Sequence, residues 1–192
     1  MQRACETEGG LHIEERADVR GYWHGAADWS GLTTDDCTNC ANQVARGDFD
    51  YVDYFRPGRA RRKPAGFVRF QLGAAHRSAC YEGVLFSKPP AGTCVAIVQL
   101  DGPPGEGYKY ESRRLTKADQ NGTKLTERRR TILEVRSQRI IASYTYFEFS
   151  TALEEIGAFA PRLHCNDPQE FSLSDRKFVI EVLRTSSRTA EE

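Results

Sequence analysis

Cysteine and histidine are the residues of this sequence whose types and spacing are best suited to chemistry. Cys37-x-x-Cys40 and His76-x-x-x-Cys80 each have a local spacing found in zinc sites, where thiolates and imidazoles share a tetrahedral ion. A long stretch separates the two halves, so the sequence leaves open whether they meet in space. Cys37 and Cys40 also fall on the apolar stripe of a predicted helix, where cysteine packs as a small hydrophobic residue. We therefore predict no metal site.

Cysteine usage also leaves the redox compartment open. An even number of cysteines with the sequon Asn121-Gly122-Thr123 suits a secreted, disulfide-bonded protein, whereas six free thiols suit an intracellular one. The polar start of the chain lacks the apolar segment of a secretory signal. The protein is therefore expected to be secreted if a signal was removed and otherwise cytoplasmic or organellar, and the localisation is left undetermined. A redox-active pair needs the strand–helix setting of thioredoxins, which the pattern does not predict. The six residues are Cys5, Cys37, Cys40, Cys80, Cys94 and Cys165.

Other catalytic signatures are sparse. The four histidines, His12, His24, His76 and His164, are scattered, and none lies in a nucleophile elbow or in a His-Glu-x-x-His motif. No glycine-rich phosphate loop is present. We therefore predict no catalytic residue and no particular cofactor, and whether the protein is an enzyme stays open.

Charge gives no global preference for nucleic acid or for a membrane surface, because 27 basic residues balance 27 acidic ones. We expect the basic segment 56–63 to be a solvated loop. Residues 66–70 match the second half of an RNP1 motif, but Ala65 replaces its first aromatic ring and Pro64 its glycine. Nucleic acid is therefore not an expected partner. No run of about 20 apolar residues occurs, so we expect no membrane insertion.

The elements that must position these side chains are mostly strands. Several segments alternate apolar and polar residues with a period of two, as in Val68, Phe70 and Leu72. Turns rich in proline and glycine separate them, which favours an antiparallel barrel or, as the main alternative, a sandwich. The predicted strands are 20–29, 49–55, 66–72, 79–86, 93–100, 107–112, 128–135, 138–149 and 177–183.

Two short helices complete the prediction. Thr33 or Thr34 is expected to cap a helix that runs to about Arg46 and ends at Gly47. A second helix is expected after the eighth strand, because Thr151-x-x-Glu154 has the spacing of a capping box.

Aromatic residues are concentrated in the predicted strands, and 138–149 carries rings on both faces. A strand that is apolar on both faces must be covered on both, by a ligand, by the helix at 151–157 or by a partner. Arg128, Arg130 and Arg136 share one face of their strand. They would bind a ligand carboxylate if that face pointed inward, but we expect it to point outward into solvent.

Gly21-Tyr22-Trp23 opens the first predicted strand and precedes a succession of antiparallel strands. This arrangement resembles the calycin superfamily, which includes lipocalins, fatty-acid-binding proteins and phycobiliprotein lyases of the lipocalin type. The resemblance implies that Trp23 closes one end of a barrel and that a late arginine packs across it. Arg184 is the best match for this arginine, and Arg139 is the second. The middle lipocalin motif, Thr-Asp-Tyr, is absent.

The sequence therefore predicts a mainly β protein, an antiparallel calycin-like β-barrel with one or two short helices. Residues 19–184 form this domain, between a loosely ordered segment at 1–18 and a disordered tail at 185–192. The expected function is to bind a small, largely apolar ligand, a lipid or a pigment, inside the barrel. The residues expected to line this site are Phe70, Tyr108, Tyr110, Tyr144 and Tyr146.

Two other functions stay open. A chromophore lyase or another enzyme would use the same pocket, and a carboxylate or arginine inside it would be the sign. A β-domain interaction module would instead act through its basic surface at 56–63. An open apolar cavity inside the barrel would support ligand binding or an enzyme, whereas a barrel filled by side chains would leave only the interaction module. The sequence does not show which strand faces point inward or what the oligomeric state is.

Overall fold

Alternating apolar residues build most of the strands in the computed structural model, which describes residues 9–25, 37–57, 65–76, 79–118, 124–150, 163–164 and 174–185. The strands are β1 (Gly10–Ile13), β2 (Ala17–Val19), β3 (Gly21–His24), β4 (Tyr51–Arg56), β5 (Gly66–Ala74), β6 (Thr93–Gln99), β7 (Tyr108–Ala118), β8 (Lys124–Glu134), β9 (Ile140–Ser150), β10 (Leu163–His164) and β11 (Leu183–Thr185). The helices are α2 (Thr38–Ala45) and α4 (Asp175–Val182). Neither described helix has the length and apolar content that crossing a membrane requires.

One mixed sheet contains most of these strands, in the order β1-β9-β8-β7-β3-β4-β5-β6, and β10 also pairs with β9. It consists of two antiparallel wings, one formed by β1, β9, β8 and β7 and the other by β4, β5 and β6. The short strand β3 joins the wings and runs parallel to both β4 and β7. Separately, β11 and β2 form a small parallel pair.

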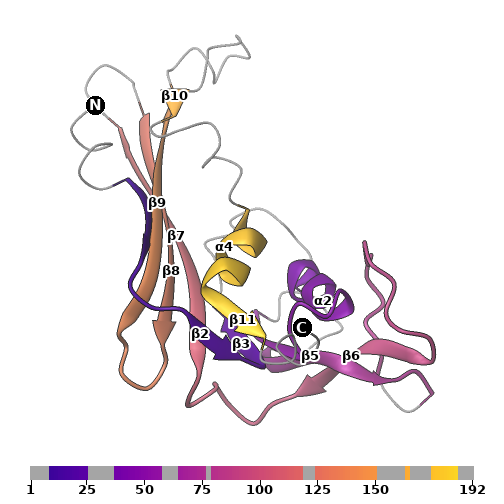
Figure 1. The fold of residues 1–192 in the computed structure, drawn as a ribbon. Helices are drawn as coiled ribbons and strands as arrows, with labels where there is room; N and C mark the ends of the chain where they lie inside the picture. Colours follow the sequence, from indigo (N-terminus) through magenta and orange to yellow (C-terminus); the bar gives the residue numbers. More distant parts are fainter. Residues whose placement is uncertain are drawn as a thin grey trace, which may run out of the picture.

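The two wings meet at an angle, and both helices lie inside that angle (Figure 1). Helix α2 packs on β4, β5 and β6, while α4 packs on β8 and continues into β11. The end strands β1 and β6 do not pair with each other. The mainly β fold is therefore confirmed, but the described strands form an open mixed sheet in place of the predicted antiparallel barrel.

Close backbone approach explains the glycine that begins β3 and the glycine that follows its last residue. A Cβ atom on Gly21 would lie 2.3 Å from the carbonyl oxygen of Tyr51 in β4. A Cβ atom on Gly25 would lie 2.7 Å from the carbonyl oxygen of Tyr110 in β7. Glycine is required at both positions because any side chain would collide with a neighbouring strand. The Gly-x-Trp-x-Gly sequence thus reflects a parallel strand held between two others.

Helix α4 closes the inner side of the β7–β9 wing. Phe178 is fully buried, with its ring centroid 6.3 Å from that of Tyr110 and 6.4 Å from that of Tyr144. Two ion pairs at the amino end hold the helix in place. Asp175 pairs with Arg130 of β8 at 2.7 Å, and Arg176 pairs with buried Asp48 before β4 at 2.7 Å. The helix therefore contacts both wings.

The prediction of a strand at 177–183 was wrong, because these residues form most of α4. Ser174 caps this helix by accepting a hydrogen bond from the Lys177 N–H, and Asp175 lies in the first turn. The buried residues are Phe178, Val179 and Val182, which is the spacing of a helical face. The apparent alternation of apolar residues came from counting half-buried Ile180 and leaving out Val179.

The predicted strand at 79–86 is a loop whose single ladder contact is the bridge between Cys80 and Ala96. A disulfide between Cys80 and Cys94 ties this loop to β6, and Asn42 of α2 bonds to the backbone of Phe86. These tertiary contacts replace the strand pairing that the apolar residues suggested.

The ends of the chain and the first helix also differ from the prediction. Strand β1 lies within the segment 1–18 that was expected to be loosely ordered, and β2 begins there and ends at Val19. Helix α2 begins at Thr38, because Cys37 has an extended backbone and is the N-cap, and it ends near Gly47 as predicted. The predicted helix at 151–157 lies outside the described residues.

Candidate functional site

The connection from β3 through α2 to β4 forms a βαβ unit, since β3 and β4 are neighbouring parallel strands. His24 is the last residue of β3, and Cys37 is the N-cap of α2. In such units the carboxyl end of the first strand and the amino end of the helix lie at the same edge of the sheet. The unit therefore brings His24 next to Cys37-x-x-Cys40.

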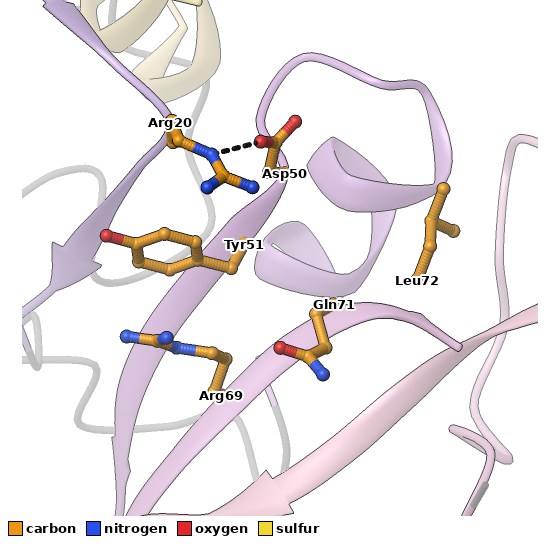
Figure 2. A pocket seen from close by; sticks show the side chains of 6 residues that line it. All are labelled: Arg20, Asp50, Tyr51, Arg69, Gln71 and Leu72. Atoms are coloured by element: carbon orange, nitrogen blue, oxygen red, sulfur yellow. Dashed lines mark hydrogen bonds and ion pairs between the residues drawn. The ribbon is translucent and has the colours of Figure 1, made fainter.

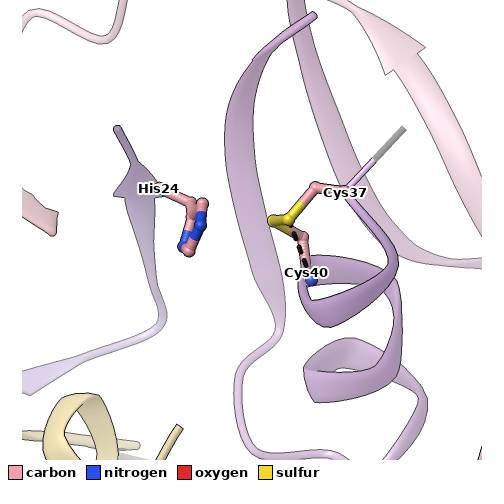
Figure 3. Close-up of side chains that lie close together, drawn as sticks. All are labelled: His24, Cys37 and Cys40. Atoms are coloured by element: carbon pink, nitrogen blue, oxygen red, sulfur yellow. Dashed lines mark hydrogen bonds between the residues drawn. A yellow bond between two sulfur atoms is a disulfide. The ribbon is translucent and has the colours of Figure 1, made fainter. Parts of the chain in front are cut away.

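A disulfide joins Cys37 and Cys40 at the amino end of α2 (Figure 3). Cys37 is half-buried and Cys40 is fully buried, so Cys37 is the sulfur that a reactant reaches more easily. The Cys40 backbone N–H donates a hydrogen bond to Cys37 Sγ at 3.2 Å. This hydrogen bond and the positive end of the helix dipole both stabilise negative charge on Cys37 Sγ.

The imidazole of His24 faces this disulfide, and one of its nitrogens lies within 4.8 Å of both sulfur atoms. Burial lowers the pKa of His24 to about 4, and the nearby carboxylate of Asp175 opposes this effect only in part. The imidazole is therefore neutral at pH 7. Stabilisation of a Cys37 thiolate thus comes from the helix end and not from a histidine cation.

Tyr22 connects the imidazole to α2. Its hydroxyl lies 3.5 Å from His24 Nδ1 and donates a hydrogen bond to Gln43 Oε1 at 3.0 Å. Burial raises the pKa of the Tyr22 hydroxyl, so this group stays protonated as a donor. The ring of His24 is thereby held in place by contacts from both β3 and the helix that carries the cysteines.

The structure separates the two halves of the cysteine and histidine pattern that was considered, and not predicted, as a zinc site. Cys80 is bonded to Cys94, and His76 is exposed beyond β5. The expectation that Cys37-x-x-Cys40 lacks a strand–helix setting was wrong, because the βαβ unit supplies one. Sequence reasoning placed both cysteines inside a helix that began too early. The cysteine at the N-cap position was the available signal, whereas nothing local pointed to His24.

The predicted ligand-binding residues lie in two places. Tyr110, Tyr144 and Tyr146 are buried on the inner face of the β7–β9 wing, where they surround Phe178 and Arg130. Phe70 is buried beneath α2, with its ring centroid 6.0 Å from that of Tyr81, and Tyr108 is half-buried. The small apolar ligand stays a prediction, since the neighbours of these rings in the structure are other protein side chains.

Arg128 and Arg130 of β8 point inward, contrary to expectation. Arg130 lies between the rings of Tyr144 and Tyr146, at 5.6 Å and 5.3 Å from their centroids, and pairs with Asp175 of α4. Arg128 lies 3.2 Å from a carboxylate oxygen of Glu148. Carboxylates of the protein therefore neutralise these two arginines. Arg136 lies in the turn after β8 and is exposed.

Trp23 lies on the opposite face of β3 from Tyr22 and His24. Lys109 Nζ is 4.0 Å from its ring centroid, and Phe67 packs edge-on at 5.8 Å. The two arginines considered for this position are both exposed, Arg184 on β11 and Arg139 in an ion pair with Glu15. The cation over the indole is thus a lysine from the adjacent strand.

A surface hollow of about 510 Å³ lies beside β4 and β5 (Figure 2). The Arg69 guanidinium lies 3.8 Å from the Tyr51 ring centroid and forms two hydrogen bonds with Asp53, while Arg20 pairs with Asp50 at 2.8 Å. Both cations are already neutralised, so this hollow is a weaker candidate for anion binding than its arginines suggest. Its lining residues are Arg20, Asp50, Tyr51, Arg69, Gln71 and Leu72.

Two sequence features fall mostly outside the described residues. In the basic segment 56–63, Arg56 is buried at the end of β4, and 58–63 are not described. The sequon at 121–123 is not described either. Comparisons with protein-family models, curated proteins and solved structures found no match to this chain.

Proposed function

We propose that this protein exchanges disulfides with thiol substrates at Cys37-x-x-Cys40. The observation that carries the proposal is the position of this pair at the amino end of α2, within a βαβ unit and beside buried His24. Short Cys-x-x-Cys pairs at helix starts have lowered thiol pKa values and reactive disulfides. Because Cys37 is half-buried and Cys40 is fully buried, a substrate reaches Cys37 first and Cys40 acts as the resolving cysteine.

The reaction begins when a substrate thiolate attacks Cys37 Sγ. The bond between Cys37 and Cys40 breaks, a mixed disulfide forms between Cys37 and the substrate, and Cys40 leaves as a thiolate that takes up a proton. A second thiolate of the same dithiol substrate then attacks the substrate sulfur and releases the thiolate of Cys37. The substrate is oxidised to a disulfide, and the protein pair gains two electrons, with one proton on Cys40 and Cys37 left as a thiolate. The reverse sequence reduces a substrate disulfide.

The second described disulfide has a different environment. Cys80 and Cys94 join a loop to β6, and neither residue lies at the start of a helix. No helix end therefore stabilises a thiolate there, and the bond fixes the 80–94 loop against the sheet. This pair provides a matched control within the same chain.

Peptide-resolved mass spectrometry tests the proposal. Trypsin releases 21–46 with Cys37 and Cys40 as its only cysteines, and 78–109 with Cys80 and Cys94. The folded protein is equilibrated in glutathione buffers of graded potential, alkylated and digested. We expect 21–46 to become reduced at potentials where 78–109 stays oxidised.

A trapping variant gives the second readout. In Cys40→Ser the resolving sulfur is absent, so Cys37 should attack a disulfide-containing model peptide, release one of its thiols and stay attached to the other half, whereas Cys37→Ser should trap none. A double variant, Cys80→Ser with Cys94→Ser, should leave exchange at 21–46 unchanged. Reduction of 21–46 only after unfolding would show that the proposal is wrong.

A further inference from the structure

Three side chains able to bind metal converge at the edge of the sheet formed by β3 and α2. His24, Cys37 and Cys40 each offer one ligand atom, and these atoms all lie within 4.8 Å of one another (Figure 3). The ligands come from two elements that tertiary structure holds together. Two cysteines separated by two residues form one half of many tetrahedral zinc sites.

We propose that the reduced pair Cys37 and Cys40, together with His24, binds a thiophilic divalent cation such as Zn²⁺. This inference rests on the proposed function, since the pair must be reducible in the folded protein. The disulfide and the metal use the same two sulfur atoms, so the two states exclude each other. Oxidation therefore releases the ion, and the bound ion protects the thiols from oxidation.

Charge balance favours a divalent ion. Cys40 is fully buried and His24 is 8% exposed, so two thiolates at this place would be costly without a compensating cation. Two thiolates and a neutral imidazole carry a charge of −2, and Zn²⁺ makes the complex neutral. Both sulfurs and the imidazole are ligand types that this ion prefers.

Contacts around the three ligands already hold them in place. The Cys40 N–H donates to Cys37 Sγ, and Tyr22 lies between His24 and Gln43. Such surrounding hydrogen bonds orient ligands and raise metal affinity. Among the described residues the cluster contains three ligands, one fewer than a tetrahedral zinc site has.

Cobalt(II) is the probe for the experiment, because tetrahedral thiolate coordination gives it strong visible and near-ultraviolet absorption. The full chain is reduced with a phosphine, freed of reductant without oxygen and titrated with Co²⁺, and Zn²⁺ is then added. We expect one Co²⁺ per chain, displacement by Zn²⁺ and no binding to the oxidised protein. The Cys80→Ser, Cys94→Ser double variant should bind equally well.

Variants of the ligands identify the site. Cys37→Ser should abolish the thiolate absorption, and His24→Gln should weaken Co²⁺ binding at least tenfold, with circular dichroism confirming that each variant is folded. Undiminished absorption in Cys37→Ser would overturn the proposal. If 21–46 is reduced but no Co²⁺ binds, the metal site is wrong and disulfide exchange stands. If 21–46 cannot be reduced in the folded protein, both are wrong.

Discussion

Protonation of His24 is the residue-scale event to which the fold is most sensitive. The imidazole is packed among the rings of Tyr22, Tyr54 and Tyr110, and Asp175 is the acidic group that acts on it. The folded protein holds its pKa at about 4, against about 6.5 in an unfolded chain. Between these two values the unfolded chain binds the proton more readily than the folded chain. The contribution of neutral His24 to the free energy of unfolding is therefore fully present above pH 6.5 and is lost as the pH falls toward 4.

His24→Gln should remove this part of the pH dependence. From pH 7.5 to pH 4.5 the wild-type chain should lose about 2–3 kcal/mol more unfolding free energy than the variant, because the shift of roughly 2.5 units is worth 1.36 kcal/mol per unit. Urea unfolding at both pH values measures the difference. Carboxylates titrate in both proteins, so their contribution cancels in the comparison. Equal losses would contradict the assignment of a buried neutral imidazole.

Phe178 provides a packing test at the same scale. Phe178→Ala should lower the unfolding free energy by about 3–5 kcal/mol, because the ring is fully buried beside Tyr110 and Tyr144. Phe86→Ala is the matched control, since this ring is 72% exposed and its removal should change stability by about 0.5 kcal/mol or less. Similar losses in the two variants, measured by chemical unfolding, would mean that α4 is not packed as described.

At the residue scale, the sequence shows those features that depend on residues close together in the chain. The spacing of Cys37-x-x-Cys40 was noted, although the pair was interpreted as part of an apolar helix face and given no chemical role. Three of the five aromatic residues expected to line a ligand site lie in one cluster, and the ligand stays a prediction. His24 was missed, because its approach to the cysteines depends on the parallel pairing of β3 with β4. No local pattern encodes that pairing.

At the scale of elements, α4 shows how capping decides between helix and strand. The segment has an alternation of apolar residues that suits a strand, but Ser174 and Asp175 form a helix start immediately before it. The helix then buries Phe178, Val179 and Val182 together, which a strand cannot do on one face. Over the eight residues of α4, the capping residues therefore predict the observed helix better than the alternation of apolar residues does.

Ser174→Ala tests the cap of α4. The Ser174 hydroxyl accepts a hydrogen bond from the Lys177 N–H at 3.3 Å, so its removal should cost about 1 kcal/mol of unfolding free energy. Ser174→Asp keeps an acceptor at the N-cap and should retain wild-type stability within about 0.5 kcal/mol. Thermal unfolding that is unchanged in Ser174→Ala would show that the cap does not contribute.

The strands of the two wings were largely predictable, because β4, β5, β6, β7, β8 and β9 alternate or carry continuous β-forming residues. The loop at 79–86 was not, since its apolar residues suggested pairing while the Cys80–Cys94 disulfide and Asn42 decide its path. Covalent and side-chain contacts from other elements overrode local preference there.

At the scale of the whole molecule, the two described disulfides constrain the unfolded chain to different degrees. Cys80 and Cys94 are separated by 14 positions, and Cys37 and Cys40 by three. A longer closed loop loses more conformational entropy, and the expected stabilisation is about 3 kcal/mol for the first and about 2 kcal/mol for the second.

Paired alanine variants measure this order. Cys80→Ala with Cys94→Ala should lower the unfolding free energy by about 1 kcal/mol more than Cys37→Ala with Cys40→Ala. Denaturant unfolding under non-reducing conditions gives both values. The reverse order would mean that the Cys37–Cys40 bond has a structural role, which would weaken its assignment as the exchangeable pair.

The overall topology was the least predictable property. The pattern of apolar residues indicates where strands lie in the sequence, but it does not show which strands are neighbours or whether they run parallel. Strand β3 lies between β4 and β7 and runs parallel to both, although β7 is far from it in the sequence. The described sheet bends around two helices in place of closing on itself. The resemblance based on Gly21-Tyr22-Trp23 therefore found a real constraint, the close packing of β3, which an open mixed sheet also produces.

Strand β3 shares more residue pairs with one of its neighbours than with the other. Four residue pairs connect β3 to β4, but only Trp23–Lys109 and His24–Tyr110 connect it to β7. His24 therefore belongs mainly to the unit formed by β3, α2 and β4, which also carries the Cys37–Cys40 disulfide. Helix α4 connects this unit to the β7–β9 wing, since Asp175 pairs with Arg130 of β8 and Arg176 pairs with Asp48 before β4. His24, Cys37 and Cys40 thus belong to the β3–α2–β4 part of the molecule, and α4 is the helix that ties this part to β8.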